Sequence, residues 1–257
     1  MIEGRDEVGD LVDAVGALDG IDLDELEAIA ALQLRRDRKY VVDMATAVSL
    51  LGRLVDPRWR VLEIGGERAH QYESVYFDTA DFDLHRDAAH GRRRRYKVRT
   101  RLYSDGTEML EVKTRTGRGD TAKGRCPLPD GRRIELGPRS RAFVEEVVGV
   151  AGAADGLMPS LHTTYERVAL VDAQCRHRLT VDLSVRCVVP DGGGCAVQGV
   201  VVESKTDGQG GVADRLLWRM GQRPVRLSKY CTGLAAVHPD LPRNKWHRTI
   251  QRHIRPL

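Results

Sequence analysis

Apolar and polar residues alternate with two different periods along the chain, and each period predicts a type of element. Apolar residues three and four apart predict one or two helices within 5–34 and further helices at 43–56, 79–89, 139–151, 211–221 and 229–237. Alternation with a period of two, bounded by turn residues, predicts strands at 35–43, 58–64, 70–78, 92–103, 107–115, 119–127, 163–172, 175–189 and 195–205. The tail, residues 239–257, is expected to pack loosely. Many antiparallel strands with helices in their connections predict an α+β fold, an antiparallel β-barrel with helices packed on its outside.

Four of the predicted strands have one apolar face and one charged face, because successive side chains on a strand point to opposite sides. The charged faces hold Lys97, Arg99 and Arg101; Glu111 and Lys113; Arg178, Thr180 and Asp182; and Glu203 and Lys205. Surface strands commonly have one charged face, but that face usually mixes many polar residue types. Here Arg and Lys dominate, with isolated carboxylates.

The predicted helices are amphipathic and need an apolar surface to cover. If they cover the apolar side of a closed sheet, the charged side lines the interior of that sheet. Crowded cations in such an interior are unfavourable unless an anion neutralises them. The pattern therefore predicts a polyanionic ligand.

Charge is distributed unevenly along the sequence. The net charge of the 257 residues is +4, but residues 6–27 hold nine acidic residues and no basic one. From residue 35 onward the balance is strongly basic. This asymmetry predicts an acidic helical segment at 1–34 beside an anion-handling domain at 35–257.

Composition narrows the possible partners and location. Aromatic residues make up 5% of the chain, which argues against stacking platforms for nucleic acid and against an RNA-binding role. No apolar stretch approaches the ~20 residues of a membrane helix, and the acidic N-terminus lacks the order of a signal peptide, so a cytoplasmic location is expected. The five cysteines include no C-x-x-C pair and signal neither a disulfide framework nor a zinc knuckle.

Seven segments carry the strongest combination of charge and spacing: "YFDTADFDLHRD", "GRRRRYKVRTRLYSDG", "LEVKTRTGRGDTAKGR", "TTYERVAL", "RLTVDLSV", "VVVESKT" and "RPVRLSKYCTGLA". In this order they resemble the VTC-type polyphosphate polymerase domain of the triphosphate tunnel metalloenzyme (CYTH-like) superfamily, over about residues 35–245. The resemblance implies an antiparallel β-tunnel with helices outside. It also implies transfer of the terminal phosphoryl group of ATP to a growing inorganic polyphosphate chain, with Mn²⁺ or Mg²⁺ as the cofactor.

The resemblance further implies which residues contact the phosphates. The catalytic positions correspond to Lys39, Arg99, Arg101, Lys113, Arg167, Arg178, Lys205 and Lys229, and Lys97 and Lys123 are expected to line the tunnel beside them. These residue types suit phosphoryl transfer, because arginine offers a planar fork for phosphate oxygens and lysine offers a compact positive charge. The attacking terminal phosphate is largely ionised near neutral pH, so no histidine base is required.

Two glutamates are the candidate metal ligands. Glu203 corresponds to the metal-binding glutamate of the family, and a carboxylate there suits Mg²⁺ or Mn²⁺, which prefer oxygen ligands. Glu111 could share that role, or it could be an ion-pair partner of Lys113 or its neighbours. The sequence alone favours neither interpretation of Glu111.

One departure from the family pattern bears on the reaction. Hydrolase members begin with an acidic "ExExK" strand, whereas residues 35–40 read "RRDRKY". Loss of those carboxylates removes metal ligands and favours binding of a polyanion over hydrolysis of triphosphate. Two rival functions remain: a triphosphate or nucleoside triphosphate hydrolase of the same fold, and a non-catalytic module that binds polyphosphate or inositol phosphate.

Overall fold

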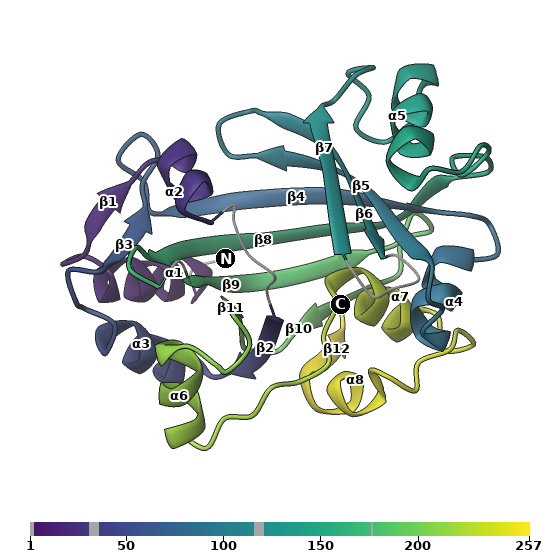
Figure 1. Ribbon diagram of the computed structural model, residues 1–257. Helices are drawn as coiled ribbons and strands as arrows, with labels where there is room; N and C mark the ends of the chain where they lie inside the picture. The colour runs from purple at the N-terminus through teal and green to yellow at the C-terminus, as the bar shows by residue number, and fades with distance from the viewer. Residues whose placement is uncertain (1–2, 31–35, 116–120, 176) are drawn as a thin grey trace. The chain divides into compact units, whose positions relative to one another are not determined.

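The computed structural model describes residues 3–30, 36–115, 121–175 and 177–257, and its elements are labelled in Figure 1. The chain divides into two compact units. Unit 1 comprises Met1–Gln71, Tyr165–Val185 and Val197–Arg226, and unit 2 comprises Tyr72–Thr164, Arg186–Ala196 and Leu227–Leu257. The predicted boundary between residues 34 and 35 lies outside the described residues, so that division of the chain stays a prediction.

Unit 1 combines helices with short and long strands. It contains α1 (Glu3–Ala14), β1 (Asp19–Ile21), α2 (Leu23–Ala30), β2 (Arg36–Val42), α3 (Met44–Gly52), β3 (Trp59–Leu62), β11 (Val200–Thr206), α6 (Val212–Arg219), the end of β8 (Met158–Asp172) and most of β9 (His177–Val188). β11 pairs antiparallel with β2 and with β9, and β3 pairs antiparallel with β8 and parallel with β1.

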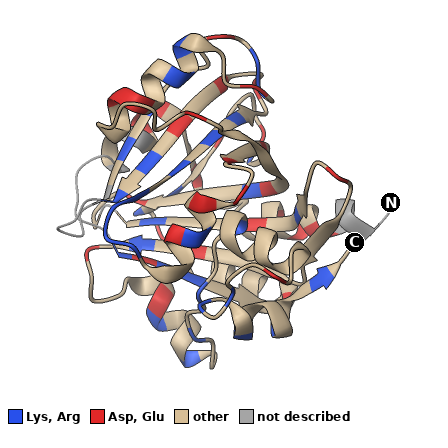
Figure 2. Ribbon diagram, turned by 90° about the vertical axis from the view of Figure 1, so that its right-hand side faces the viewer, with Lys and Arg blue, Asp and Glu red and all other residues tan. Residues whose placement is uncertain are grey.

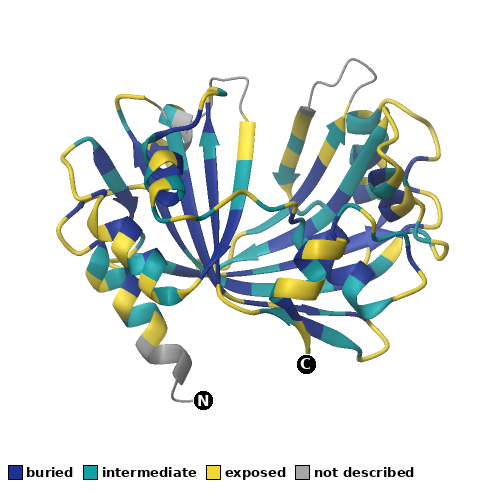
Figure 3. Cartoon of the chain, turned by 90° about the horizontal axis from the view of Figure 1, so that it is seen from below, coloured by how far each residue is buried: buried dark blue, intermediate teal, exposed yellow. Residues whose placement is uncertain are grey.

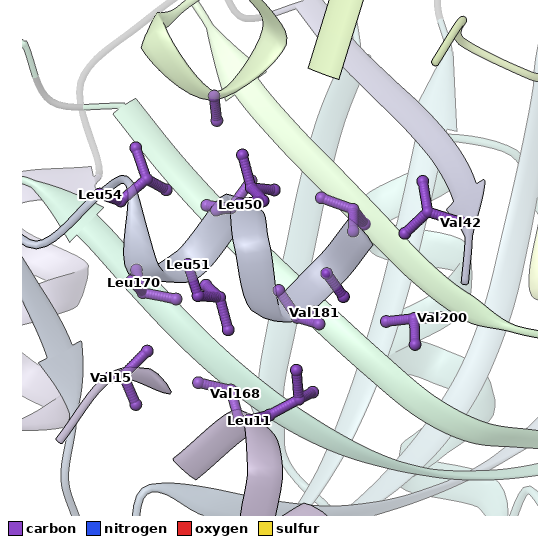
Figure 4. Close-up of a cluster of buried hydrophobic side chains, with 14 of the residues drawn as sticks. Leu11, Val15, Val42, Leu50, Leu51, Leu54, Val168, Leu170, Val181 and Val200 are labelled. Atoms are coloured by element: carbon purple, nitrogen blue, oxygen red, sulfur yellow. The ribbon is translucent and has the colours of Figure 1, made fainter. Parts of the chain in front are cut away.

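A buried apolar cluster joins the helices of unit 1 to one face of its strands (Figure 4). Side chains of α1 and α3, and of the residues just after these helices, meet side chains from β2, β8, β9 and β11 in this cluster. Those labelled are Leu11, Val15, Val42, Leu50, Leu51, Leu54, Val168, Leu170, Val181 and Val200. Because side chains alternate along a strand, the intervening residues Lys39, Asp182 and Glu203 point away from these helices. The predicted separation of an apolar and a charged face is therefore confirmed in unit 1.

Unit 2 also combines strands with helices. It contains most of β4 (Ala69–Asp78), α4 (Asp83–His90), β5 (Arg95–Tyr103), β6 (Glu108–Arg115), β7 (Thr121–Pro127), α5 (Pro138–Val148), β10 (Gly194–Val197), α7 (Lys229–Val237), α8 (His247–His253) and β12 (Ile254–Pro256). β4, β5, β6 and β7 pair with one another in that order, each pair antiparallel. Together with unit 1, these elements confirm the α+β class with an antiparallel sheet.

Helix α5 covers the apolar face of β5, β6 and β7. Val144 of α5 shares a buried cluster with Val98, Leu110 and Val112. The close approach depends on Gly124 in β7, because a Cβ at that position would lie 2.6 Å from a side-chain carbon of Val147. In Figure 3 the strands are largely buried, whereas exposed residues are prominent on the helices and loops.

Three local predictions were wrong. The tail is ordered, since it forms α8 and β12 and its last backbone N–H, at Leu257, donates to the carbonyl of Gly194 at 3.1 Å. Residues 195–205 form two strands, which are separated at Gly199, whose φ of +99° is a conformation that favours glycine. Residues 92–94 precede β5 and are not part of it. Across the described ranges, no helix is long and apolar enough to cross a membrane.

Replacement of Gly124 by alanine is expected to destabilise the protein. A methyl group 2.6 Å from Val147 forces α5 or β7 to shift, and such overpacking typically costs ~1–3 kcal/mol in the free energy of unfolding. The midpoint of thermal unfolding, followed by circular dichroism, should therefore fall by several degrees.

Gly52→Ala in α3 is the matched control, because nothing lies within 4 Å of a Cβ there and alanine favours a helix over glycine. Its midpoint should stay the same or rise. If Gly124→Ala behaved like this control, the close packing of α5 on β7 would be contradicted.

Candidate functional site

Three lysines stand side by side across unit 2. In the register of the strands, Lys97 of β5 lies opposite Lys113 of β6, and Lys113 lies opposite Lys123 of β7. Like charges in directly opposed positions destabilise a sheet. This lysine row, defined by Lys97, Lys113 and Lys123, therefore favours a negative charge nearby. Figure 2 shows that Lys and Arg lie along the strands as well as on helices and loops.

The whole charged face of β5, β6 and β7 is strongly basic. Strand alternation and register assign to it eight basic residues and one carboxylate, Glu111; the basic residues are Arg95, Lys97, Arg99, Arg101, Lys113, Arg115, Lys123 and Arg125. The predicted site residues of β5 and β6 therefore share one face with Lys123. This face has the residue types that bind phosphate oxygens.

Glu111 is held inside this basic face and is almost completely buried, with 2% of its surface exposed. One carboxylate oxygen accepts a hydrogen bond from Arg99 Nε at 2.7 Å and the other accepts from Lys123 Nζ at 2.6 Å, while Arg101 Nη1 lies 3.9 Å away. Burial opposes ionisation, but the charges of Arg99, Arg101 and Lys123 outweigh it and hold the pKa of the carboxyl well below its ordinary value. Glu111 is therefore an ionised partner of these three cations.

Two of the basic side chains, Arg99 and Lys97, contact the aromatic rings of Tyr76 and Tyr230. Arg99 Nη1 donates to the Tyr76 hydroxyl at 2.9 Å, and the guanidinium carbon lies 5.6 Å from the centre of that ring. The Tyr76 ring stacks on the Tyr230 ring with centroids 5.0 Å apart. Lys97 Nζ lies 5.6 Å from the centre of the Tyr230 ring. Cation–π contacts of this kind restrict the positions of Arg99 and Lys97.

The carboxylate of Asp78 anchors these rings. It is fully buried and accepts hydrogen bonds from the backbone N–H groups of Leu84 and His85, at 2.9 and 3.0 Å, and from the Tyr230 hydroxyl. Burial raises the pKa of Asp78, and these hydrogen bonds oppose that shift. Asp78, Tyr76 and Tyr230 are not among the residues that the sequence pattern predicts for the site. Pairing of the "YFD" strand with β5 is the signal that could have found Tyr76, because Tyr76 lies opposite Arg99.

The first turn of α7 lies beside the lysine row. Ser228 caps α7, since its hydroxyl accepts from the Cys231 N–H at 3.2 Å, and the same oxygen accepts from Lys97 Nζ at 3.0 Å. Lys229, a predicted site residue, is the first residue of α7. The N-terminus of a helix carries a partial positive charge. This end of α7 therefore adds to the positive potential around Lys97.

In unit 1 the charged face of the sheet centres on Glu203. The Glu203 side chain lies between two lysines, with Lys39 Nζ 3.5 Å from one carboxylate oxygen and Lys205 Nζ 3.4 Å from the other. Lys205 lies opposite Arg178 of β9 in the register. Both lysine contacts are longer than the 2.7–2.9 Å of a charge-assisted hydrogen bond. The carboxylate is thus neutralised without a tight contact to either lysine.

Arg167 has a different environment from the other predicted arginines. Its guanidinium makes a fork with the fully buried carboxylate of Asp182, with Nε 2.6 Å from one oxygen and Nη2 2.9 Å from the other. A bidentate pair of this kind fixes the plane of the guanidinium. The geometry therefore orients Arg167 on β8 through a carboxylate of β9.

β2 keeps one carboxylate on the charged face of unit 1. Asp37 lies two residues before Lys39 and opposite Lys205, so strand alternation places it on the face that holds Glu203. This corrects the expectation that the basic "RRDRKY" sequence leaves β2 without such a group.

The predicted site residues thus form two groups, one in each unit. The group in unit 2 is Lys97, Arg99, Arg101, Glu111, Lys113, Lys123 and Lys229, and the group in unit 1 is Lys39, Arg167, Arg178, Glu203 and Lys205. Of the two candidate metal ligands, Glu111 accepts short hydrogen bonds from Arg99 and Lys123, whereas Glu203 has a lysine Nζ 3.4–3.5 Å from each oxygen. A metal at Glu111 stays a prediction, and the contacts favour its interpretation as an ion-pair partner.

Comparisons with known proteins give one family and one structural likeness. The model of the VTC domain family matches residues 34–238. No curated protein matched the sequence. Eighteen chains of solved structures match, and one of them is HpAC1 from Hippeastrum, which is described as an adenylyl cyclase with a dominant triphosphatase activity. The two sequences are 16% identical and the TM-score is 0.49. The match covers 77% of this chain and 94% of the HpAC1 chain.

Anion binding is expected to depend on pH through Lys123. The Lys123 side chain is 44% exposed along its length, but desolvation of its ammonium group beside Glu111 lowers the pKa to about 8, with the charge of Glu111 opposing the shift. The positive charge is therefore present below that pH and is lost above it. Affinity for tripolyphosphate, measured by calorimetry without divalent cations, should therefore fall between about pH 7 and pH 9 by up to about tenfold.

Lys123→Arg is the control, because a guanidinium stays charged throughout this range. The titration of the ligand itself affects both proteins equally, so the difference between their pH profiles isolates Lys123. Identical profiles would show that Lys123 does not lose its charge near pH 8 at the binding surface.

Proposed function

The chain belongs to the VTC domain family, and we propose that it is a polyphosphate polymerase that transfers the terminal phosphoryl group of ATP to the end of an inorganic polyphosphate chain. Residues 34–238 match the family model, which is most of the 257-residue chain. Family membership supports a function that involves triphosphate or polyphosphate. That the chain uses such a ligand to make polyphosphate is our proposal.

The lysine row of unit 2 is the observation that carries the proposal. Lys97, Lys113 and Lys123 are direct neighbours in the register, and Glu111, the carboxylate on that face of β5–β7, is shared by Lys123, Arg99 and Arg101. A single small anion cannot reach every residue of a face that extends over three strands about 4.8 Å apart. A chain of linked phosphates has the repeated charge that this surface would neutralise.

Besides charge neutralisation, phosphoryl transfer requires that the reacting groups be positioned, and the arginines can do this. Phosphoryl transfer depends mainly on alignment of the reacting groups and on neutralisation of charge on the transferred group. Arg99 is held by Glu111 and Tyr76, and Arg167 is held by Asp182, so both guanidinium groups are oriented before a ligand binds. Oriented donors lose little conformational entropy on binding, which favours the transition state.

Glu203 is the residue that would hold Mg²⁺ or Mn²⁺. These ions commonly bind proteins through one or two carboxylates and complete their coordination with water and phosphate oxygens. When bound, such an ion would neutralise charge on the triphosphate. Lys39 and Lys205 lie near both Glu203 oxygens and would hold the carboxylate in position.

Hydrolysis of triphosphate is the second candidate function, and Asp37 is the observation that favours it. Asp37 adds a carboxylate to the face that holds Glu203, and a second acidic group allows tighter metal binding or orientation of water. The choice between the two functions depends on whether phosphate or water attacks the triphosphate.

Product analysis separates the candidates. Purified protein with ATP and Mn²⁺ should yield inorganic polyphosphate together with ADP if the chain is a polymerase. Free phosphate without polymer would support the hydrolase. Absence of both products, together with tight polyphosphate binding, would support a non-catalytic polyanion-binding module.

Glu203→Gln should lower the turnover of ATP by roughly 100-fold or more, because it removes the charge that attracts the divalent cation. Polyphosphate binding measured without metal should be largely retained, since the amide preserves the shape of the side chain and removes a negative charge. Glu63→Gln is a suitable control, since Glu63 is also paired with a basic residue, Arg68, in unit 1. Full activity in Glu203→Gln would refute the metal assignment.

A further inference from the structure

A cluster of possible metal ligands lies at the turn between β8 and β9, within unit 1. β8 ends at Asp172, β9 begins at His177, and Cys175 lies in the turn between them. One ligand atom from each of these three residues lies within 4.8 Å of the other two. The cluster is separate from the predicted phosphate-binding residues, and its function does not depend on the proposed polymerase activity.

The turn fixes the Asp172 carboxylate and leaves one of its oxygens unsatisfied. Oδ1 accepts from the backbone N–H groups of Gln174 and Cys175, at 3.1 and 3.0 Å. Oδ2 is buried without a hydrogen bond, and the nearest basic group is Arg58 Nε at 3.6 Å. Asp172 itself has no exposed surface. A buried carboxylate oxygen in this state is costly, and a cation is the partner that would relieve the cost.

His177 has a similarly incomplete environment. Its Nδ1 is buried without a hydrogen bond, while its Nε2 lies 3.6 Å from an oxygen of Asp207. Metal-bound histidines typically direct their second ring nitrogen toward a carboxylate or carbonyl group. If Nδ1 is the nitrogen that binds the metal, Asp207 lies where it would hold the other ring nitrogen.

Cys175 determines which metal the cluster would select. It is the exposed member of the three, so a metal ion can reach its sulfur from solvent. Thiolate and imidazole ligands favour Zn²⁺ and similar borderline-soft ions, whereas Mg²⁺ and Mn²⁺ prefer oxygen. The cluster thus differs in kind from the carboxylate at Glu203.

Charge and distance are compatible with a divalent cation. Asp172 and a Cys175 thiolate together balance two positive charges, and Arg58, which faces the cluster, also has Asp56 at 3.7 Å. Zinc-to-ligand bonds are about 2.0–2.3 Å long, so the three ligand atoms must approach one another by about 1 Å. Rotation of the exposed Cys175 side chain provides much of that movement.

We propose that Asp172, Cys175 and His177 form a binding site for Zn²⁺ or a similar borderline-soft divalent cation, with water as the remaining ligand. A metal bound there links the last residue of β8 to the first residue of β9. It would therefore stabilise the hairpin that carries the Arg167–Asp182 pair.

Cobalt binding is the direct test, because Co²⁺ occupies zinc sites and gives a thiolate-to-metal charge-transfer band. Full-length protein is freed of metal with a chelator, kept reduced with a phosphine and titrated with Co²⁺. We expect one equivalent of Co²⁺ to produce the band, and Zn²⁺ but not Mg²⁺ to abolish it. Added Zn²⁺ should also raise the midpoint of thermal unfolding by several degrees.

Cys175→Ser should abolish the charge-transfer band and the stabilisation by Zn²⁺, and His177→Gln should weaken Co²⁺ binding at least tenfold. Cys126→Ser is the matched control, since Cys126 lies on β7 in unit 2, and it should behave as the unchanged protein does. Because Cys175 is exposed, its serine variant is expected to fold normally. Absence of a band, or a band that persists in Cys175→Ser, would overturn the proposal.

Discussion

Repulsion among the basic side chains of β5, β6 and β7 is the constraint on which the organisation of unit 2 depends. Lys97, Lys113 and Lys123 are direct neighbours in the register, and a single carboxylate, Glu111, lies on the same face. The sheet tolerates this repulsion because α5 buries its other face, and apolar burial does not depend on the charges. The net result is a folded surface with a strong positive potential, which favours an anionic ligand.

The same cations are held in position by groups that carry no positive charge. Asp78, on β4, binds the hydroxyl of Tyr230, the Tyr230 ring stacks on Tyr76, and the Tyr76 hydroxyl accepts a hydrogen bond from Arg99. Glu111 accepts a hydrogen bond from Nε of the same arginine. This chain of contacts connects a buried carboxylate to the basic face of β5, β6 and β7. Prior orientation of this kind reduces the entropy lost when a ligand binds.

The charged face of unit 1 differs from that of unit 2, because it carries several carboxylates as well as basic side chains. Asp182 is fully engaged by Arg167, whereas Glu203 has a lysine 3.4–3.5 Å from each oxygen. The bidentate pair fixes the guanidinium of Arg167, whereas the two lysines lie farther from the Glu203 oxygens. The apolar cluster behind these strands is what keeps all of these groups on one side of the sheet.

The sequence by itself determined the elements and the separation of faces, because the period of apolar residues is a local property that each strand or helix carries along its own length. It therefore predicted that Lys97, Arg99 and Arg101 share a side, and that Glu203 and Lys205 do. Tertiary structure alone decided which side chains contact one another. The lysine row and the partners of Glu111 follow from the register of β5, β6 and β7. The contact between Asp78 and Tyr230 joins residues that are 152 positions apart. The split at Gly199 and the docking of the tail were likewise decided by contacts with distant segments. Such pairings depend on how the chain closes on itself, and no local pattern of residues encodes that closure.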